Sequence, residues 1–151
     1  MIITWQGGEK FTVKTKNAVV KIGEIIKIND FEIHGEGEYE VGGVECQGMI
    51  GNIFVFAFGD IRMAYLNNLK RALRENERDL IGEIDILLTP VNDLAKQNIQ
   101  NLEPKISIPY GFEDLGKFCQ DFSCPEPVDR VKLKKADLPE KHEIIVLNYS
   151  K

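Results

Sequence analysis

One short stretch of the chain places a histidine beside several carboxylates. His34 is followed by Glu36, Glu38 and Glu40, and alternate residues of an extended strand point to the same face. These side chains can converge on a metal ion, with His34, Glu36 and Glu38 as candidate ligands. In the alternative, which we favour, the intervening glycines interrupt the strand and leave the acids in solvent, because one histidine with scattered glutamates makes a poor transition-metal site.

Nucleophilic catalysis has little support in the sequence. The serines and histidines form no Gly-x-Ser-x-Gly motif. Cys119 and Cys124 stand five residues apart, without a CxxC pair, so zinc ligation is only weakly indicated. We interpret these two cysteines and Cys46 as reduced thiols, and we expect Cys119 to be a core residue on the apolar face of a helix.

The first half of the chain is predicted to form strands that position any such site. Phe11 and Val13 alternate with polar neighbours, as expected of a half-buried strand. Residues 53–58 are apolar on both faces, so we expect them deep in a sandwich, followed by a tight turn at Gly59 and Asp60. The predicted strands cover residues 1–5, 11–16, 19–22, 25–28, 31–34, 39–41, 44–46, 53–58 and 61–66.

The second half is predicted to alternate helices with strands. The first helix begins at Asn67 or Asn68 and ends before Gly82. The second is capped by Asn92 or Asp93. A third helix places one apolar stripe over residues 112–122, and strands are predicted at residues 84–91, 105–108, 131–133 and 144–147. This order predicts an α+β fold of layered sheets with outer helices, in a single domain over residues 1–151.

Composition excludes several classes of partner. The 151 residues are 43% hydrophobic and carry a net charge of −5, with a pI near 5.1. A negative protein opposes the phosphates of nucleic acid, and no stretch approaches the ~18 apolar residues of a membrane helix. We therefore expect a cytoplasmic protein that binds neither nucleic acid nor membrane.

Several motifs, taken in order, resemble the metallo-β-lactamase fold, in particular its lactonase-like branch of predicted metal-dependent hydrolases. The opening segment 3–7 resembles the branch's "ITWLGHSCF" and residues 36–41 resemble "GPGEYEV". Residues 52–69 resemble "NTIYVIEIDGIRICHLGDLG", and residues 85–91 resemble "DILLIPVGG". The resemblance spans nearly the whole chain and implies a truncated αββα sandwich with outer helices.

The same resemblance shows where metal ligands are missing. The family's first histidine falls on Gly8, its late histidine on Gly111, and its bridging aspartate on Asn68. The histidine before that aspartate falls on Tyr65, and the aspartate expected after the second strand pair falls near Gly23. The HxHxDH signature is absent, since the chain passes from Ile28 through a short turn to Phe31.

These replacements argue against the family's chemistry. Glycine offers no side-chain ligand and an asparagine amide carries no charge, so nothing lowers the pKa of a bound water. We therefore predict no cofactor and a catalytically inactive protein with a binding or structural role. The alternatives are a metal-dependent hydrolase with a non-standard site, and a small-molecule-binding module that uses a vestigial cleft. The positions that define this cleft are Gly8, Tyr65, Asn68, Asn92, Tyr110 and Gly111.

Two questions about this cleft and its surroundings stay open in the sequence. Tyr65 and Tyr110 can line a pocket or fill the void left by the metals. The missing segment is expected to leave an apolar sheet surface at residues 19–22 and 25–28, or an unpaired strand edge. A symmetric homodimer would cover it; alternatively, loops fold over the gap and the protein is a monomer that binds another protein or a small molecule.

Overall fold

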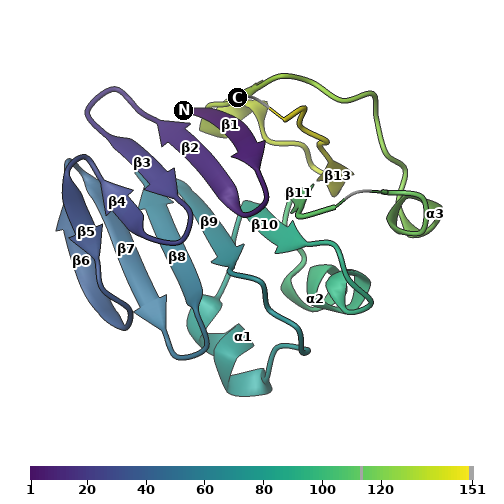
Figure 1. The fold of residues 1–151 in the computed structure, drawn as a ribbon, viewed down its shortest axis with the longest axis horizontal. Coiled ribbons are helices and arrows are strands. Elements are labelled where there is room, and N and C mark those ends of the chain that lie inside the picture. The colour runs from purple at the N-terminus through teal and green to yellow at the C-terminus, as the bar shows by residue number, and fades with distance from the viewer. Residues whose placement is uncertain (113, 150–151) are drawn as a thin grey trace.

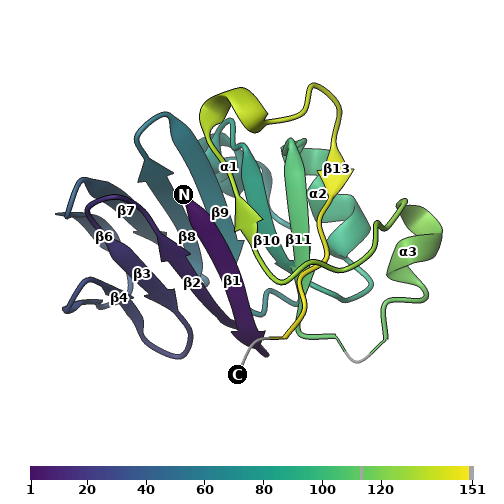
Figure 2. The same cartoon turned by 90° about the horizontal axis from the view of Figure 1, so that it is seen from above.

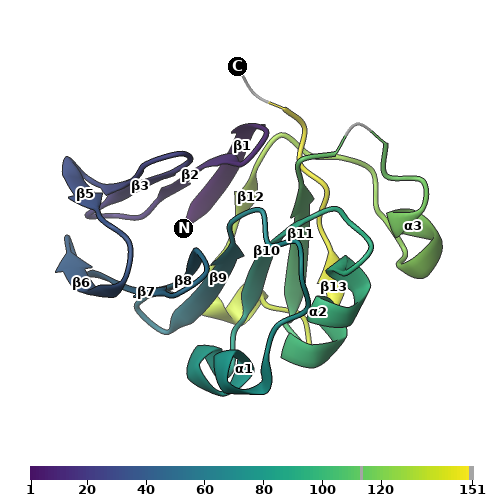
Figure 3. The same ribbon diagram turned by 60° about the horizontal axis from the view of Figure 1, so that its bottom comes forward.

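The computed structural model describes residues 1–112 and 114–149 and packs two β-sheets face to face (Figures 1 and 3). One sheet has the strand order β12-β1-β2-β3-β4-β5 and the other has the order β13-β11-β10-β9-β8-β7-β6. The strands are β1 (Ile2–Gly7), β2 (Lys10–Lys14), β3 (Val19–Ile22), β4 (Ile26–Ile28), β5 (Phe31–Ile33), β6 (Gly37–Val41), β7 (Val44–Met49), β8 (Ile53–Phe58), β9 (Ile61–Leu66), β10 (Ile86–Pro90), β11 (Ile106–Tyr110), β12 (Val131–Lys132) and β13 (Glu143–Ile144).

Alternation along the strands separates the core from the surface. Phe11 and Val13 of β2 are buried between the sheets, as their spacing predicts. β8 contributes to both sides of its sheet: Phe56 packs into the inter-sheet cluster, whereas Ile53 and Val55 pack in a second cluster beneath the helices. The prediction that residues 53–58 lie deep in the sandwich is confirmed.

The helices cover only one of the two sheets. α1 (Glu75–Ile81), α2 (Ala95–Leu102) and the short α3 (Phe118–Asp121) all lie on the side of the seven-stranded sheet or beside it (Figure 3). Within the described residues, no helix covers the outer face of the six-stranded sheet. The fold is therefore a mostly β sandwich, and the αββα arrangement predicted for its truncated form is not observed. No helix in this described part is long and apolar enough to cross a bilayer.

The helix boundaries differ from those predicted. α1 begins at Glu75, not at Asn67 or Asn68, and residues 67–74 form a loop. Its end is as predicted, because Gly82 takes a φ of 67° and donates its N–H to the carbonyl of Arg78 at 2.9 Å. The third helix was predicted over residues 112–122, but α3 has only four residues; a 3₁₀ turn, η1 (Lys135–Asp137), follows β12.

The interpretation of all three cysteines as reduced thiols is wrong for two of them. Cys119 and Cys124 form a disulfide, and both are half-buried, so Cys119 is not a free core thiol. Cys46 is a free thiol and is buried between the sheets. Burial raises the pKa of Cys46 to about 12, which keeps its sulfur protonated at neutral pH.

The apolar sheet surface expected at residues 19–22 and 25–28 is also not observed. Val20, Ile22, Ile26 and Ile28 point into the inter-sheet cluster, whereas the alternating positions between them carry lysines that face outward. The outer face of this sheet is therefore mixed and carries no continuous apolar surface, although Ile25, within the predicted range, is 53% exposed. Phe31, on β5 at the end of the sheet, is 50% exposed.

Candidate functional site

The six cleft positions gather at the carboxyl ends of three neighbouring strands of the seven-stranded sheet, β9, β10 and β11. β10 runs parallel to both β9 and β11, so the carboxyl ends of these three strands meet there, and this is where open sheets with parallel strands bind ligands. β9 carries Tyr65, β11 ends at Tyr110, and the turn between β1 and β2 approaches from the other sheet. The cleft positions in the adjoining loops are Gly8, Asn68, Asn92 and Gly111.

Tyr110 is bonded to the main chain at the end of β9. Its hydroxyl donates to the carbonyl of Leu66 at 2.5 Å and accepts from the N–H of Asn68 at 2.9 Å. The side chain is fully buried, and burial raises the pKa of the Tyr110 hydroxyl well above its usual range. This hydroxyl therefore stays neutral and fixes the point where the chain leaves β9.

Tyr65 packs against Tyr110 beneath the turn between β1 and β2. The ring centroids lie 5.7 Å apart, and both residues are 0% exposed. The Tyr65 hydroxyl bonds to the carbonyl of Glu9 at 3.3 Å and to Oδ1 of Asn67 at 3.1 Å. Burial, together with the neighbouring Tyr110, raises the pKa of Tyr65. Of the two readings of these tyrosines, the structure supports the one in which they fill the space.

The loop residues that form the rim above the tyrosines are exposed and carry few side chains. Nδ2 of Asn68 donates to a carboxylate oxygen of Glu9 at 3.4 Å. Gly8 and Gly111 both have a positive φ, and a Cβ added at either position would meet nothing within 4 Å. At the positions where the family's histidines would stand, there is thus room for a side chain but no metal ligand.

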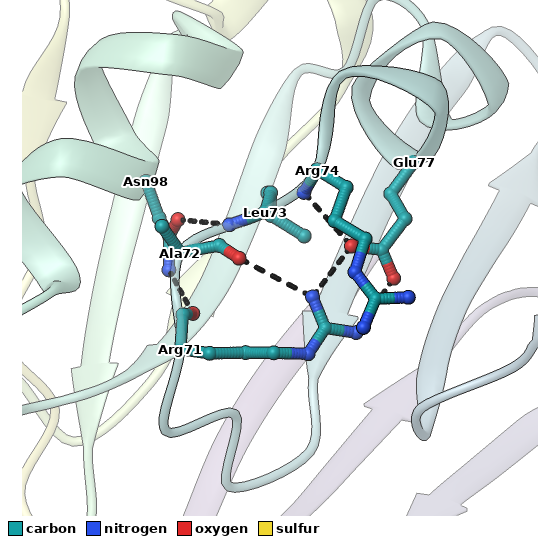
Figure 4. Close-up of polar contacts among 6 residues, drawn as sticks. All are labelled: Arg71, Ala72, Leu73, Arg74, Glu77 and Asn98. Atoms are coloured by element: carbon teal, nitrogen blue, oxygen red, sulfur yellow. Dashed lines mark hydrogen bonds and ion pairs between the residues drawn. The ribbon is translucent and has the colours of Figure 1, made fainter.

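The 67–74 loop is held by an ion pair between the half-exposed Arg71 and the buried Glu77 (Figure 4). Nη1 and Nη2 of Arg71 lie 2.6 and 2.7 Å from Oε1 and Oε2 of Glu77, a bidentate pair. The N–H of Arg74 donates to the same carboxylate at 2.8 Å. These contacts, led by Arg71, lower the pKa of Glu77 to about 2 although burial opposes the shift.

The same loop is also bonded to α2 and to the end of β10. Oδ1 of Asn98 accepts from the N–H of Leu73 at 3.0 Å, within the buried base of the loop (Figure 4). Asn92 donates from Nδ2 to the carbonyl of Leu69 at 2.9 Å and accepts from the N–H of Leu94 at 2.9 Å. Asn92 therefore positions the loop and the start of α2, and does not join the tyrosines directly.

The weak metal candidates do not come together. His34 lies 3.6 Å from a carboxylate oxygen of Glu32, a residue outside the predicted set, whereas Glu36 and Glu38 are exposed. Across the described residues, no group of three or more His, Cys, Asp or Glu side chains is arranged to hold a metal ion.

One serine and one histidine meet elsewhere, which the sequence did not reveal. Ser107 Oγ lies 2.8 Å from Nε2 of His142. Ser107 is fully buried within β11, so its hydroxyl is closed to a substrate. Burial lowers the pKa of His142, and no carboxylate among the described residues accepts a hydrogen bond from its ring. This pair is a structural contact and not a catalytic dyad.

The donor set at the cleft does not fit a transition metal. Zinc and manganese sites need several nitrogen or carboxylate ligands that converge. Among the described residues around the tyrosines, the carboxylate in contact is that of Glu9, beside the neutral amide of Asn68. The two phenols are kept neutral by their raised pKa values and are already bonded to the protein.

Comparison with known proteins places the fold. A family model described as "Beta-lactamase superfamily domain" matches residues 5–110, more than half of the chain. The chain belongs to the metallo-β-lactamase superfamily. A crystal structure of a Thermotoga maritima protein, described as a candidate Zn-dependent hydrolase of this superfamily, is similar over 97% of this chain and 98% of that one, with a TM-score of 0.85 and 24% identity. No protein of curated function matches.

The coverage of both chains shows that this short form of the superfamily fold is not peculiar to the present protein. Sequence reasoning nevertheless missed several residues that shape its site. Glu9 follows directly after Gly8 and carries the one charge beside Asn68, so its position was a usable signal. Glu77 stands at the third position of α1, where a glutamate often bonds back to the start of a helix. Asn98 gave no local signal, because its partner lies 25 residues away.

Proposed function

We propose that this chain is a non-hydrolytic member of the metallo-β-lactamase superfamily whose role is binding or structural. The observation that carries the proposal is the buried pair of Tyr65 and Tyr110. Their rings occupy the base of the cleft and their hydroxyls are bonded to the protein. A hydrolase of this fold relies on a metal to generate a nucleophilic hydroxide from water, and the donors at this cleft do not supply such a site.

Elemental analysis and hydrolysis assays test the proposal together. Protein purified without chelator is expected to hold well under one equivalent of zinc, manganese or iron. Phosphodiester, lactone and β-lactam substrates are expected to turn over no faster than in buffer. The informative variants are E9Q and N68A, which alter the polar rim, and H34A as a control on the separate histidine.

Three outcomes separate the alternatives. Stoichiometric metal with turnover that E9Q or N68A abolishes would establish a hydrolase with a non-standard site and defeat the proposal. Turnover that H34A alone abolishes would move the chemistry to β5 and β6, with the same consequence. A tightly held organic molecule found by native mass spectrometry, without turnover, would favour the small-molecule-binding module.

We further propose that the binding role is self-association through a sheet edge. β5 ends the six-stranded sheet, so one side of its backbone has no strand partner within the described chain. Phe31 on this strand is 50% exposed and contacts Tyr39 at a centroid distance of 6.2 Å. An open edge with an apolar side chain favours pairing with another strand, and two-fold pairing of identical chains is the commonest closed arrangement.

Light scattering on matched variants tests this assembly. The wild-type protein at micromolar concentration is expected to show a dimer mass, and F31E is expected to show a monomer mass. The control is L80E, because Leu80 on α1 is similarly exposed, at 56%, but lies on a helix. A monomeric wild-type protein, or equal loss of the dimer in both variants, would reject the edge as the interface.

We also propose a cytoplasmic location. Disulfides in that compartment are uncommon and are mostly transient or redox-sensing. The Cys119–Cys124 bond therefore agrees with a cytoplasmic location only if it is of that transient or redox-sensing kind. Trapping of thiols with an alkylating agent in intact cells tests it: a bond that is largely reduced in growing cells supports the location, and a permanently oxidised bond contradicts it.

A further inference from the structure

A disulfide closes a short loop at the side of the sandwich. α3 contains Cys119, and Cys124 stands five positions later in the chain. We call residues 119–124 the disulfide loop. α3 stands out from the sheets beyond β13 in all three views (Figures 1, 2 and 3). A helix of four residues has too few internal hydrogen bonds to hold its own shape, so its position depends on its contacts.

The disulfide loop forms part of the wall of two cavities. The first has a volume of about 760 Å³ and is lined by Phe122, Cys124, Val128 and His142 among others. The second, of about 560 Å³, is lined by Ile99, Phe122 and His142 among others. Both volumes lie in the range of small-molecule sites.

Phe122 and His142 line both cavities, so this pair of side chains, which we call the partition, lies where the two cavities adjoin. Their ring centroids lie 5.7 Å apart in an edge-on arrangement. Nε2 of His142 is hydrogen-bonded to Oγ of Ser107 at 2.8 Å. The ring of Phe122 also packs against that of Phe118, with the centroids 5.1 Å apart. His142 is anchored to the sheet, whereas Phe122 lies within the disulfide loop. The partition is therefore fixed on one side and depends on the disulfide on the other.

We propose that the Cys119–Cys124 disulfide is a thiol-exchange site that controls whether the two cavities are separate or joined. The partner is a dithiol reductant, either a small molecule or a protein. Its thiolate attacks Cys124, which lines the first cavity, and forms a mixed disulfide while Cys119 leaves as a thiolate and takes up a proton. The second thiol of the reductant then attacks the mixed disulfide and releases Cys124. The protein gains two electrons and two protons, and the reductant becomes a disulfide.

Exposure distinguishes this bond from the remaining cysteine. Cys119 and Cys124 are both half-buried, whereas Cys46 is 2% exposed and its pKa is raised to about 12 by burial. A reductant can reach the first pair in the folded protein and cannot reach Cys46.

The contacts that remain after reduction are weak. α3 is linked to α2 by an ion pair between Lys96 and Asp121 at 3.4 Å. The residue before α3, Lys117, pairs with Asp93 at 2.9 Å, and both of these side chains are more than 80% exposed. Exposed ion pairs contribute little to stability. Phe118 anchors the start of α3 in the core, whereas Phe122 and Cys124 are only partly buried against the same cluster, so residues 122–124 are held less firmly once the bond is broken.

Alkylation of the native protein tests accessibility. The folded chain is treated with dithiothreitol, the reductant is removed, and iodoacetamide is added before intact-mass measurement. The expected result is two added groups, on Cys119 and Cys124, with Cys46 unlabelled until denaturant is added. If the pair is reduced only at the denaturant concentration that exposes Cys46, the bond is a structural staple and the proposal fails.

A dye that binds apolar cavities tests the partition. Fluorescence of 8-anilinonaphthalene-1-sulfonate is expected to rise when the wild-type protein is reduced. The same high signal is expected without reductant in C119S/C124S and in F122A, while C46S is expected to behave like the wild type in both states. Protection of Cys46 from alkylation verifies that C119S/C124S and F122A are folded, and circular dichroism verifies the same for C46S. Unchanged dye binding on reduction of the folded protein would overturn the proposal.

Discussion

The ion pair between Arg71 and Glu77 gives a stability prediction that the structure allows to be worked out. The pKa of Glu77 falls from 4.5 to about 2 in the folded protein, which corresponds to roughly 3 kcal/mol at 1.36 kcal/mol per pKa unit. The Arg71 side chain is 36% exposed, so solvent screens part of this contribution. The E77Q variant keeps a side-chain acceptor for Arg74 but loses the charge. We expect its free energy of unfolding at pH 7 to fall by about 2 kcal/mol.

The sign of the pH dependence follows from the direction of the shift. A carboxyl whose pKa is lower in the folded state stabilises the protein above its unfolded pKa, here 4.5. That contribution is lost as the pH falls from 4.5 through about 2, because in this range the Glu77 carboxyl of the unfolded chain binds a proton more readily than that of the folded protein. The difference between wild type and E77Q should therefore be full at pH 7 and nearly absent at pH 2.

Urea denaturation followed by circular dichroism measures this difference. The matched control is E75Q, because Glu75 lies in the same first turn of α1 but is exposed. Its effect should stay within about 0.5 kcal/mol. Hydrogen exchange adds a local readout, since loss of the pair should weaken protection of the Leu73 amide. An E77Q protein as stable as E75Q at pH 7, or a deficit that persists unchanged at pH 2, would refute the reasoning.

Two further predictions concern the tyrosines and the glycine turn. Y110F removes a hydroxyl bonded to β9 and leaves the amide of Asn68 without its acceptor, so thermal denaturation should show a loss of about 1–3 kcal/mol; unchanged stability would mean that water replaces the hydroxyl. G7A places a Cβ 2.0 Å from the Tyr149 ring, whereas G8A meets no atom within 4 Å. Both strain a positive φ, so G8A should cost about 1 kcal/mol and G7A clearly more; equal losses would contradict the contact.

The strands were predictable because burial alternates with a period of two. Phe11 and Val13 face the core as their spacing requires, and the doubly apolar segment 53–58 lies between two clusters. The same rule corrects the one wrong prediction about the sheet surface. Lys21 and Lys27 sit between the apolar residues of β3 and β4, which already indicated a polar outer face.

The helix starts were not predictable from local signals. Asn67 and Asn68 have the chemistry of helix caps. The segment that follows is nevertheless a loop, and it buries the side chains of Leu69 and Leu73 without forming a helix. That loop is stabilised by Asn98, whose partner in the sequence is distant. The disulfide was missed for a related reason, since a spacing of five without a second pair matches no metal or redox motif.

The positions of the cleft were predictable from the motifs, but the packing of the side chains there was not. Following the motifs identified Gly8, Asn68 and Gly111 as positions without metal ligands. It left open whether Tyr65 and Tyr110 line a pocket or fill one, because that depends on packing between two sheets. The bonds of Tyr65 to Glu9 and of Tyr110 to Leu66 join distant elements, and spacing along the chain carries no information about them.

The filled base of the cleft also constrains how this lineage can change. Gly8 and Gly111 have room for a side chain, at the cost of a strained positive φ. Tyr65 and Tyr110 are different, because removing a buried aromatic ring costs about 3–5 kcal/mol, a large part of the roughly 5–15 kcal/mol that keeps a domain folded. Sequence variation at this cleft is therefore expected to concentrate at the exposed glycines of its rim and to spare the two tyrosines, whose rings join the two sheets.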